Sequence, residues 1–123
     1  MNKMASRKII RTYTFYSDKH PDKKIAIITI EESLLDSFGN IKILDKELVP
    51  LDIILVEKYN NTLSGAISCL EDRAMPPNRC FFEDYCKKHN LDPYNINDRL
   101  KLNQGRTYYD DIYVIMEETI TDV

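Results

Sequence analysis

The hydrophobic period of the chain changes near Asn61, and this change constrains the fold more than any other feature. Before Asn61, residues 9–16 alternate between two faces and are rich in β-branched and aromatic side chains, which predicts a strand. After Asn61 the apolar positions follow the period of one helical face. The residues at this spacing are Leu63, Ala66, Ile67 and Leu70. Strands followed by helices indicate an α+β fold.

The first half of the chain contains further strand-like segments. Residues 25–30 form a short apolar run, and we expect them to pair with residues 9–16 as a hairpin. Residues 41–44 and 52–56 read as two more short strands. The expected turns and breaks are the loop 17–22, Gly39-Asn40 and Pro50.

The second half is expected to be helical. The helix that begins near Leu63 must end before Pro76-Pro77, because proline inside a helix costs about 3 kcal/mol or more. Asn78 is placed to cap a second helix. Its apolar face comprises Phe81, Phe82, Tyr85 and Cys86. We therefore predict that the two prolines separate two helices that pack as a hairpin on the sheet.

The end of the chain predicts one more helix and one more strand. Residues 94–100 form a short helix that buries Ile96 and Leu100, Gln104-Gly105 breaks it, and residues 112–116 return as a strand. The expected architecture is a small antiparallel sheet with a helical hairpin and a short third helix on one side. We expect a single domain over residues 1–123, strand-rich in 1–58 and helical in 61–102.

Composition indicates a soluble cytoplasmic protein. The 123 residues are 43% apolar, which suffices for a core, and no apolar run is long enough to span a bilayer. The basic start of the chain lacks the apolar core of a signal peptide.

Three cysteines without a CxxC pair favour reduced thiols over a disulfide framework. Zinc is the alternative, because Cys86 and His89 lie three apart and Cys80 precedes them. Structural zinc needs four ligands with a close first pair, so we expect buried thiols and no metal or cofactor.

No catalytic constellation emerges from the sequence. His20 lies in an expected loop and His89 at a helix end, and the chain has only three glycines, none in a phosphate-binding pattern. Glu71-Asp72 and Asp110-Asp111 are adjacent acids, for which pairing with nearby arginines is the simplest role. We therefore expect no enzymatic activity.

Arginine and tyrosine are the side chains most suited to a contact surface. Arg73 and Arg79 bracket the proline corner, and Arg106 follows Gly105. Either these arginines fix turns through carboxylates, or they form a patch for a partner. Tyr108 and Tyr109 follow two and three residues after Arg106, and tyrosine is frequent at interfaces. The candidate partner-binding residues are Arg73, Arg79, Arg106, Tyr108 and Tyr109.

The charge distribution is weak evidence for a nucleic-acid partner. The net charge is −3, and residues 63–106 carry seven basic and six acidic side chains. The first 24 residues are basic, but five acids and no base follow from residue 110 onward. An acidic tail would oppose a phosphate backbone.

The segment 67–114 resembles the end of the small N-terminal subdomain of HipA-like serine/threonine kinases, which also exists as a short stand-alone protein. The matching residues are Leu70, Pro76, Arg79, Tyr85, Gly105, Arg106 and the pair Asp110-Asp111. The kinase lobes are absent from this chain. The resemblance implies a toxin–antitoxin accessory protein that binds a separate kinase and restrains it. The alternative is a mobile-element regulator or counter-defence protein that binds nucleic acid or a nucleoprotein.

Overall fold

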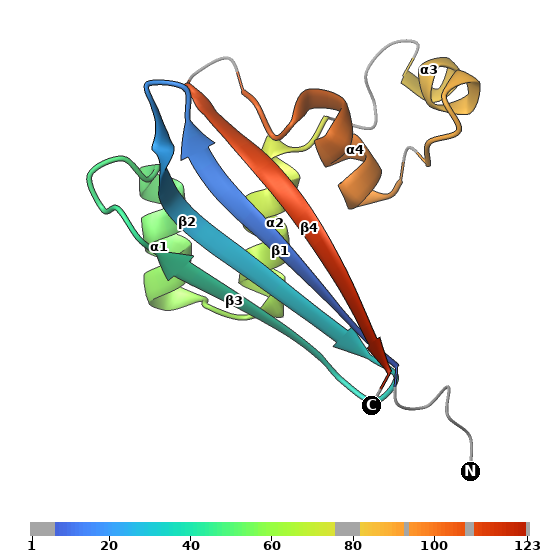
Figure 1. Ribbon diagram of the computed structural model, residues 1–123, viewed down its shortest axis with the longest axis horizontal. Coiled ribbons are helices and arrows are strands. Elements are labelled where there is room, and N and C mark those ends of the chain that lie inside the picture. Colours follow the sequence, from blue (N-terminus) through green and yellow to red (C-terminus); the bar gives the residue numbers. More distant parts are fainter. Residues whose placement is uncertain (1–6, 76–81, 93, 108–109, 123) are drawn as a thin grey trace.

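The computed structural model describes residues 7–75, 82–92, 94–107 and 110–122. Within these ranges, four antiparallel strands form one sheet in the order β3-β2-β1-β4 (Figure 1). The strands are β1 (Arg7–Ser17), β2 (His20–Ser33), β3 (Ser37–Ile43) and β4 (Ile112–Asp122). The last strand, β4, is therefore an edge strand that pairs with the first strand, β1, in the interior of the sheet.

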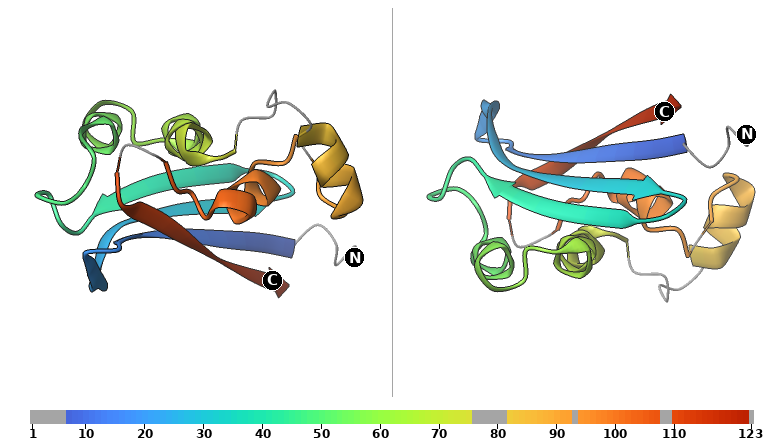
Figure 2. Two further views of the ribbon diagram at one scale, coloured as in Figure 1. Left: turned by 90° about the horizontal axis from the view of Figure 1, so that it is seen from above. Right: turned by 90° about the horizontal axis from the view of Figure 1, so that it is seen from below.

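The helices that pack on this sheet lie on one of its faces, and the other face has no helix over it in the described part of the chain (Figures 1 and 2). The helices are α1 (Leu51–Tyr59), α2 (Leu63–Arg73), α3 (Phe82–Lys88) and α4 (Ile96–Asn103). The expected α+β class, with an antiparallel sheet and helices on one side, is confirmed. No helix in the described ranges is long and apolar enough to cross a membrane.

The core lies between the sheet and the first two helices. Alternation along β1 directs Tyr13 and Phe15 toward the helices, where both are almost fully buried. Their buried neighbours from the other elements include Ile28, Ile41, Ile53, Ala66 and Leu70. The second half of the predicted strand face of β1 and most of the predicted helical face of α2 are thus core.

Residues 52–56 are helical, so their prediction as a strand was wrong, and the strand-rich part ends at β3. Pro50 precedes α1, and its carbonyl accepts hydrogen bonds from the amides of Ile53 and Ile54. The continuous apolar run 53–56 does not distinguish a strand from a helix by period alone. Here packing decides, because Ile53 is buried against the core.

Gly39-Asn40 is not a turn but part of β3. Gly39 is required for space: a Cβ atom there would lie 2.5 Å from the Cα of Leu63 and 3.2 Å from the Cβ of Ala66. The start of α2 therefore crosses β3 at the one strand position without a side chain.

The helical hairpin on the sheet is made by α1 and α2, not by α2 and the helix after the prolines. The connection between α1 and α2 is short, and α3 lies away from the sheet (Figure 1). Pro76, Pro77, Asn78 and Phe81 lie outside the described residues; α2 ends before them and α3 begins after them.

Two predicted apolar positions are exposed. Ile67 of α2 is 40% exposed, while Cys69 is buried in its place. The buried side of α2 is therefore rotated by part of a turn from the predicted face. Tyr85 of α3 is 48% exposed, whereas Cys86, on the same predicted face, is buried as expected. Both cysteines are free buried thiols, as expected, and burial raises the pKa of Cys69 to about 11. Cys80 lies outside the described residues.

The predicted short third helix is confirmed as α4. Leu100 is buried and Ile96 packs against the core. Asn95 caps the helix, because its side-chain oxygen accepts hydrogen bonds from the amides of Asn97 and Asp98. The final strand continues well beyond residue 116, to Asp122.

Candidate functional site

Arg73, the last residue of α2, is 3% exposed and reaches into the turn that precedes β4. Its Nε donates to the carbonyl oxygen of Gly105 at 2.8 Å. Its two terminal nitrogens donate to the two carboxylate oxygens of Asp110 at 3.0 and 2.7 Å, and one of them also donates to the carbonyl of Ile112 at 3.1 Å. A two-point guanidinium–carboxylate pair is geometrically specific. Arg73 therefore connects α2 to both ends of this turn.

The Asp110 carboxylate is satisfied by several donors at once. Besides Arg73, it accepts hydrogen bonds from the amide of Ile112 and the hydroxyl of Thr107. Burial opposes ionisation, but the hydrogen bonds from Arg73, Ile112 and Thr107 outweigh it and lower the pKa of Asp110 below its ordinary value. This carboxylate is committed to holding the turn.

A second buried arginine joins α4 to α2. Arg99 is 5% exposed, pairs with Glu71, and donates to the carbonyl of Met75 at 3.4 Å. Its Nε is buried and has no hydrogen-bond partner among the described residues. The expected pairing of the acidic residues with arginines thus holds for Glu71 and Asp110.

The turn between α4 and β4 has a backbone that directs the next residue outward. Gln104 and Gly105 have φ angles of 55° and 65°, and a Cβ on Gly105 would lie 2.6 Å from a methyl carbon of Val114. Glycine is therefore required at 105 for both conformation and space. The Asn103 side chain supports the turn by donating to the carbonyls of Arg73 and Arg106.

Arg106 leaves this turn on the outer surface. Its terminal nitrogens donate to the two carboxylate oxygens of Asp18 at 2.6 and 3.1 Å, and its guanidinium lies 4.8 Å from the ring centroid of Tyr113. The Tyr113 ring stacks on Tyr16, with centroids 5.6 Å apart. The hydrogen bonds between Arg106 and Asp18 lower the pKa of the Asp18 carboxyl and raise the pKa of the Arg106 guanidinium.

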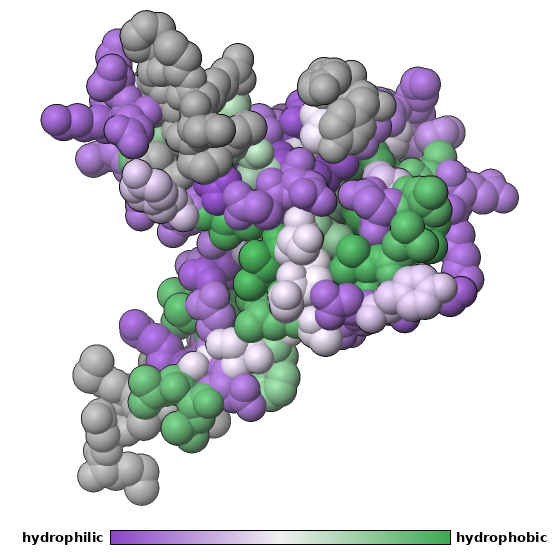
Figure 3. Space-filling view, turned by 180° about the vertical axis from the view of Figure 1, so that it is seen from behind, coloured by the Kyte–Doolittle hydropathy of each residue, from purple (hydrophilic) through white to green (hydrophobic). Residues whose placement is uncertain are grey.

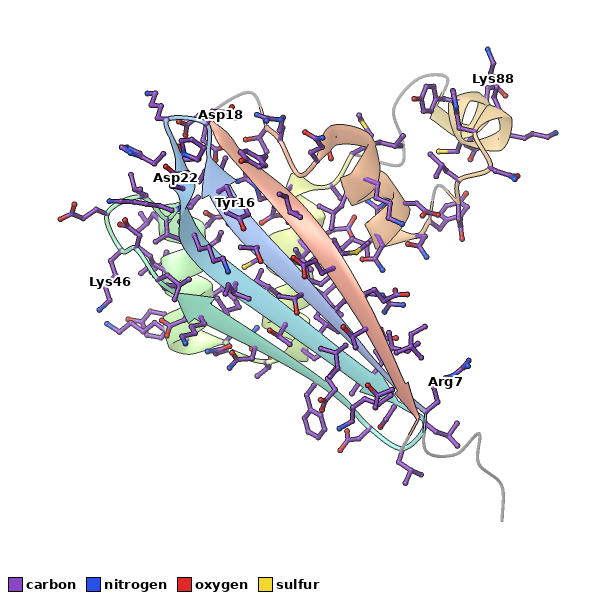
Figure 4. All side chains as sticks on the ribbon, in the orientation of Figure 1. Arg7, Tyr16, Asp18, Asp22, Lys46 and Lys88 are labelled. Atoms are coloured by element: carbon purple, nitrogen blue, oxygen red, sulfur yellow. The ribbon has the colours of Figure 1, made fainter. Side chains whose placement is uncertain are left out.

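We call Tyr16, Asp18, Arg106 and Tyr113 the Arg106 corner. Asp18 lies at the β1–β2 turn with Tyr16 close by on β1 (Figure 4). The side chains of Arg106 and Asp18 are 42% and 50% exposed. An exposed guanidinium is thus held in one orientation beside a pair of aromatic rings.

The structure separates the candidate residues chosen from the sequence. Arg73 is buried, which makes it a scaffold residue, whereas Arg106 is available at the surface. Arg79, Tyr108 and Tyr109 lie outside the described residues. Sequence reasoning missed Tyr16 and Asp18 as site residues, because they lie far from Arg106 in the chain and only strand pairing brings them together.

Comparison of the chain with protein-family models, curated proteins and solved structures finds no match. The Arg106 corner is therefore interpreted from its own chemistry.

Proposed function

We propose that this protein is a non-catalytic protein-binding module and that the Arg106 corner is part of its contact surface. The observation that carries the proposal is the exposed Arg106 guanidinium, held by Asp18 and stacked near Tyr113. Arginine and tyrosine are the residues that most often dominate the energy of protein interfaces.

The corner is organised before any partner arrives. The two-point pair with Asp18 restricts the long Arg106 side chain, and the Tyr16–Tyr113 stack restricts both rings. Side chains that are already ordered lose less conformational entropy on binding. This supports a role in recognition, because an exposed arginine without these partners would be mobile.

For the partner, we propose a separately encoded HipA-like kinase in the cytoplasm, which this module binds and restrains as a toxin–antitoxin accessory protein. This part of the proposal rests on the sequence resemblance alone. A neighbouring reading frame that encodes a HipA-like kinase core would support it.

The chemistry of the corner favours a protein over the alternative partner, nucleic acid. Binding of single strands uses free aromatic faces and unpaired cations. Here the Tyr113 ring already contacts both Tyr16 and Arg106, and the Arg106 charge is paired with Asp18. The neighbouring Asp111, which accepts a hydrogen bond from Ser17, adds negative charge.

Titration calorimetry with a purified HipA-like kinase core that lacks its own N-terminal subdomain tests the proposal. We expect wild-type protein to bind and Arg106→Ala to bind at least about tenfold more weakly with an unchanged circular dichroism spectrum. Lys88→Ala is the matched control, because Lys88 is an exposed cation on α3, far from the corner (Figure 4).

The outcomes separate the parts of the proposal. Equal affinities of wild type and Arg106→Ala would reject the corner as a contact surface. Failure of the wild type to bind any kinase core would reject the kinase as partner. Tight binding to duplex DNA with a steep salt dependence would instead support the nucleic-acid alternative.

A further inference from the structure

The two edges of the sheet differ in how their backbone groups are satisfied. At the β3 edge, the side-chain amide of Asn61 accepts a hydrogen bond from the amide of Ile41 at 2.7 Å and donates to its carbonyl at 3.0 Å. Asn61 thereby makes the two hydrogen bonds that a neighbouring strand would make. This edge is closed at its centre by the protein itself.

The β4 edge is open over most of its length. The amide of Val114 donates to the carbonyl of Gln104 at 2.7 Å, so the backbone of Val114 faces away from β1. Backbone direction alternates along a strand, so Met116, Glu118 and Ile120 face outward too. Among the described residues, their outward amide and carbonyl groups have no hydrogen-bond partner.

The open part of β4 lacks most of the features that usually protect an edge. It contains no proline or glycine, and its pairing with β1 runs from Ser17 opposite Ile112 to Arg7 opposite Asp122 without a bulge. Short strands, bulges, prolines and charged side chains are the common protections against strand addition. Of these, the open part of β4 has only the charges of Glu117 and Glu118, and in Figure 2 β4 is the outermost strand on its side of the sheet.

A hollow lies beside this edge, between the strand and α4. It has a volume of about 270 Å³, and its wall includes Tyr13, Asn97, Leu100 and Met116. The outline of the molecule is recessed on this side, where the sheet extends beyond the helices (Figure 3). In strand addition, backbone hydrogen bonds supply affinity and pockets for alternate side chains supply specificity. The edge of β4 offers both unpaired backbone groups and a hollow that can receive side chains.

The side chains of β4 specify the chemistry of the added strand. Those on the helix side are Met116, Glu118 and Ile120, and the charge of Glu118 is paired with Arg11. Glu117 points to the opposite face and has no basic partner among the described residues. Residues 112–122 carry two glutamates and an aspartate and no basic residue. A complementary strand has apolar side chains toward the hollow and basic side chains on the other face.

We propose that the open edge of β4, residues 116–120, binds an extended segment of a partner protein with alternating apolar and basic side chains. The inference deepens the proposed protein-binding function and rests on it for the existence of a partner, but it concerns a different surface. A second copy of this chain fits poorly. Antiparallel self-pairing centred on Glu118, the middle of the open part, places Glu118 opposite Glu118, and like charges directly opposite are unfavourable.

The probe is an acetylated and amidated octapeptide of four Lys-Val repeats, and the readout is amide hydrogen exchange by NMR. In the free protein we expect the amides of Met116, Glu118 and Ile120 to exchange fast and those of Ile115 and Glu117 slowly. The peptide should protect the first set, whereas a Glu-Val octapeptide should not. Overturning results are an unchanged exchange pattern at saturating Lys-Val peptide, or concentration-dependent protection without peptide, which would assign the edge to a second copy.

Two variants at one position isolate the backbone contribution. Glu118→Pro removes one outward amide without removing a donor to β1, and Glu118→Gln keeps that amide while losing the same charge and its pair with Arg11. We expect the proline variant to bind the Lys-Val peptide at least tenfold more weakly than the glutamine variant. Equal binding by two folded variants would overturn strand addition. If the proline variant does not fold, the exchange experiment on the wild type still decides whether the open edge of β4 binds the peptide.

The test is separable from that of the Arg106 corner. Arg106→Ala should bind the Lys-Val peptide with wild-type affinity, because Arg106 lies outside the open edge. Glu117→Lys should reverse the preference from the Lys-Val to the Glu-Val peptide. An unchanged preference in Glu117→Lys would reject the charge complementarity on which the choice of partner rests.

Discussion

Arg73 and Asp110 form a buried two-point ion pair that joins the last residue of α2 to the turn before β4. The pair connects segments that are far apart in the chain and close together in the fold. Arg73 also donates to the carbonyl of Gly105 and so supports the turn at Gly105, after which Arg106 lies at the surface. The stability of this connection should therefore be measurable separately from any binding.

Arg73→Ala should lower the free energy of unfolding by about 3–5 kcal/mol, because it leaves the Asp110 carboxylate without its buried partner. The free energy of unfolding of Arg73→Lys should lie between those of the wild type and Arg73→Ala, since an ammonium group keeps the charge but lacks the planar fork. Urea denaturation provides the measurement. Arg106→Ala is the control, because its ion pair is exposed and contributes little. Similar losses in Arg73→Ala and Arg106→Ala would contradict the scaffold role of Arg73.

Acid should destabilise the protein through Asp110. Its pKa is lower in the folded state than the value of about 3.9 for an unfolded chain, so below that pH the unfolded state takes up the proton first. The stabilisation is present above about pH 4 and is lost as the pH falls through the folded-state pKa. Urea midpoints from neutral pH down to about pH 2 test this. Asp110→Asn should be less stable at neutral pH, and its urea midpoint should fall less steeply as the pH is lowered. An identical pH dependence in the variant and the wild type would exclude Asp110 as a cause of the acid destabilisation.

Gly39→Ala should destabilise the protein by about 1–3 kcal/mol, because the new methyl group would overlap the backbone of Leu63. The neighbouring Asn40→Ala is the control and should change stability by no more than about 0.5 kcal/mol, since Asn40 is exposed. Thermal unfolding of both variants provides the comparison. A neutral Gly39→Ala would show that α2 can move away from β3 without cost.

Asn61→Ala should open the β3 edge. The change removes both hydrogen bonds to Ile41 and should cost about 1 kcal/mol or more. Faster hydrogen exchange of the Ile41 amide is the specific readout. Asn60→Ala removes an equivalent side-chain amide, which accepts a hydrogen bond from Thr62 and makes none to Ile41, so it should leave the exchange of Ile41 unchanged. Unchanged exchange in Asn61→Ala would mean that the side chain does not close this edge.

Local patterns in the sequence were sufficient where the environment of an element is regular. The alternation around Tyr13 and Phe15 predicted β1, and the spacing of Ile96 and Leu100 predicted α4, because one face of each element is buried and the other is not. The turn at Gln104-Gly105 was predictable for a similar reason, since glycine permits the left-handed backbone found there.

Tertiary structure alone decided the remaining features, because they depend on contacts between distant segments. Residues 53–56 are all apolar, so their period does not distinguish a strand from a helix, and their packing decides that they are helical. Arg73 and Arg106 look alike in the sequence, yet one is buried against Asp110 and the other is exposed beside Asp18. Asn61 and Gln104 close parts of the sheet edges only because the chain returns there, and the open edge of β4 is a property of the strand order. The sequence by itself thus determined which segments could form strands and helices, and folding determined which side chains remain available for a partner.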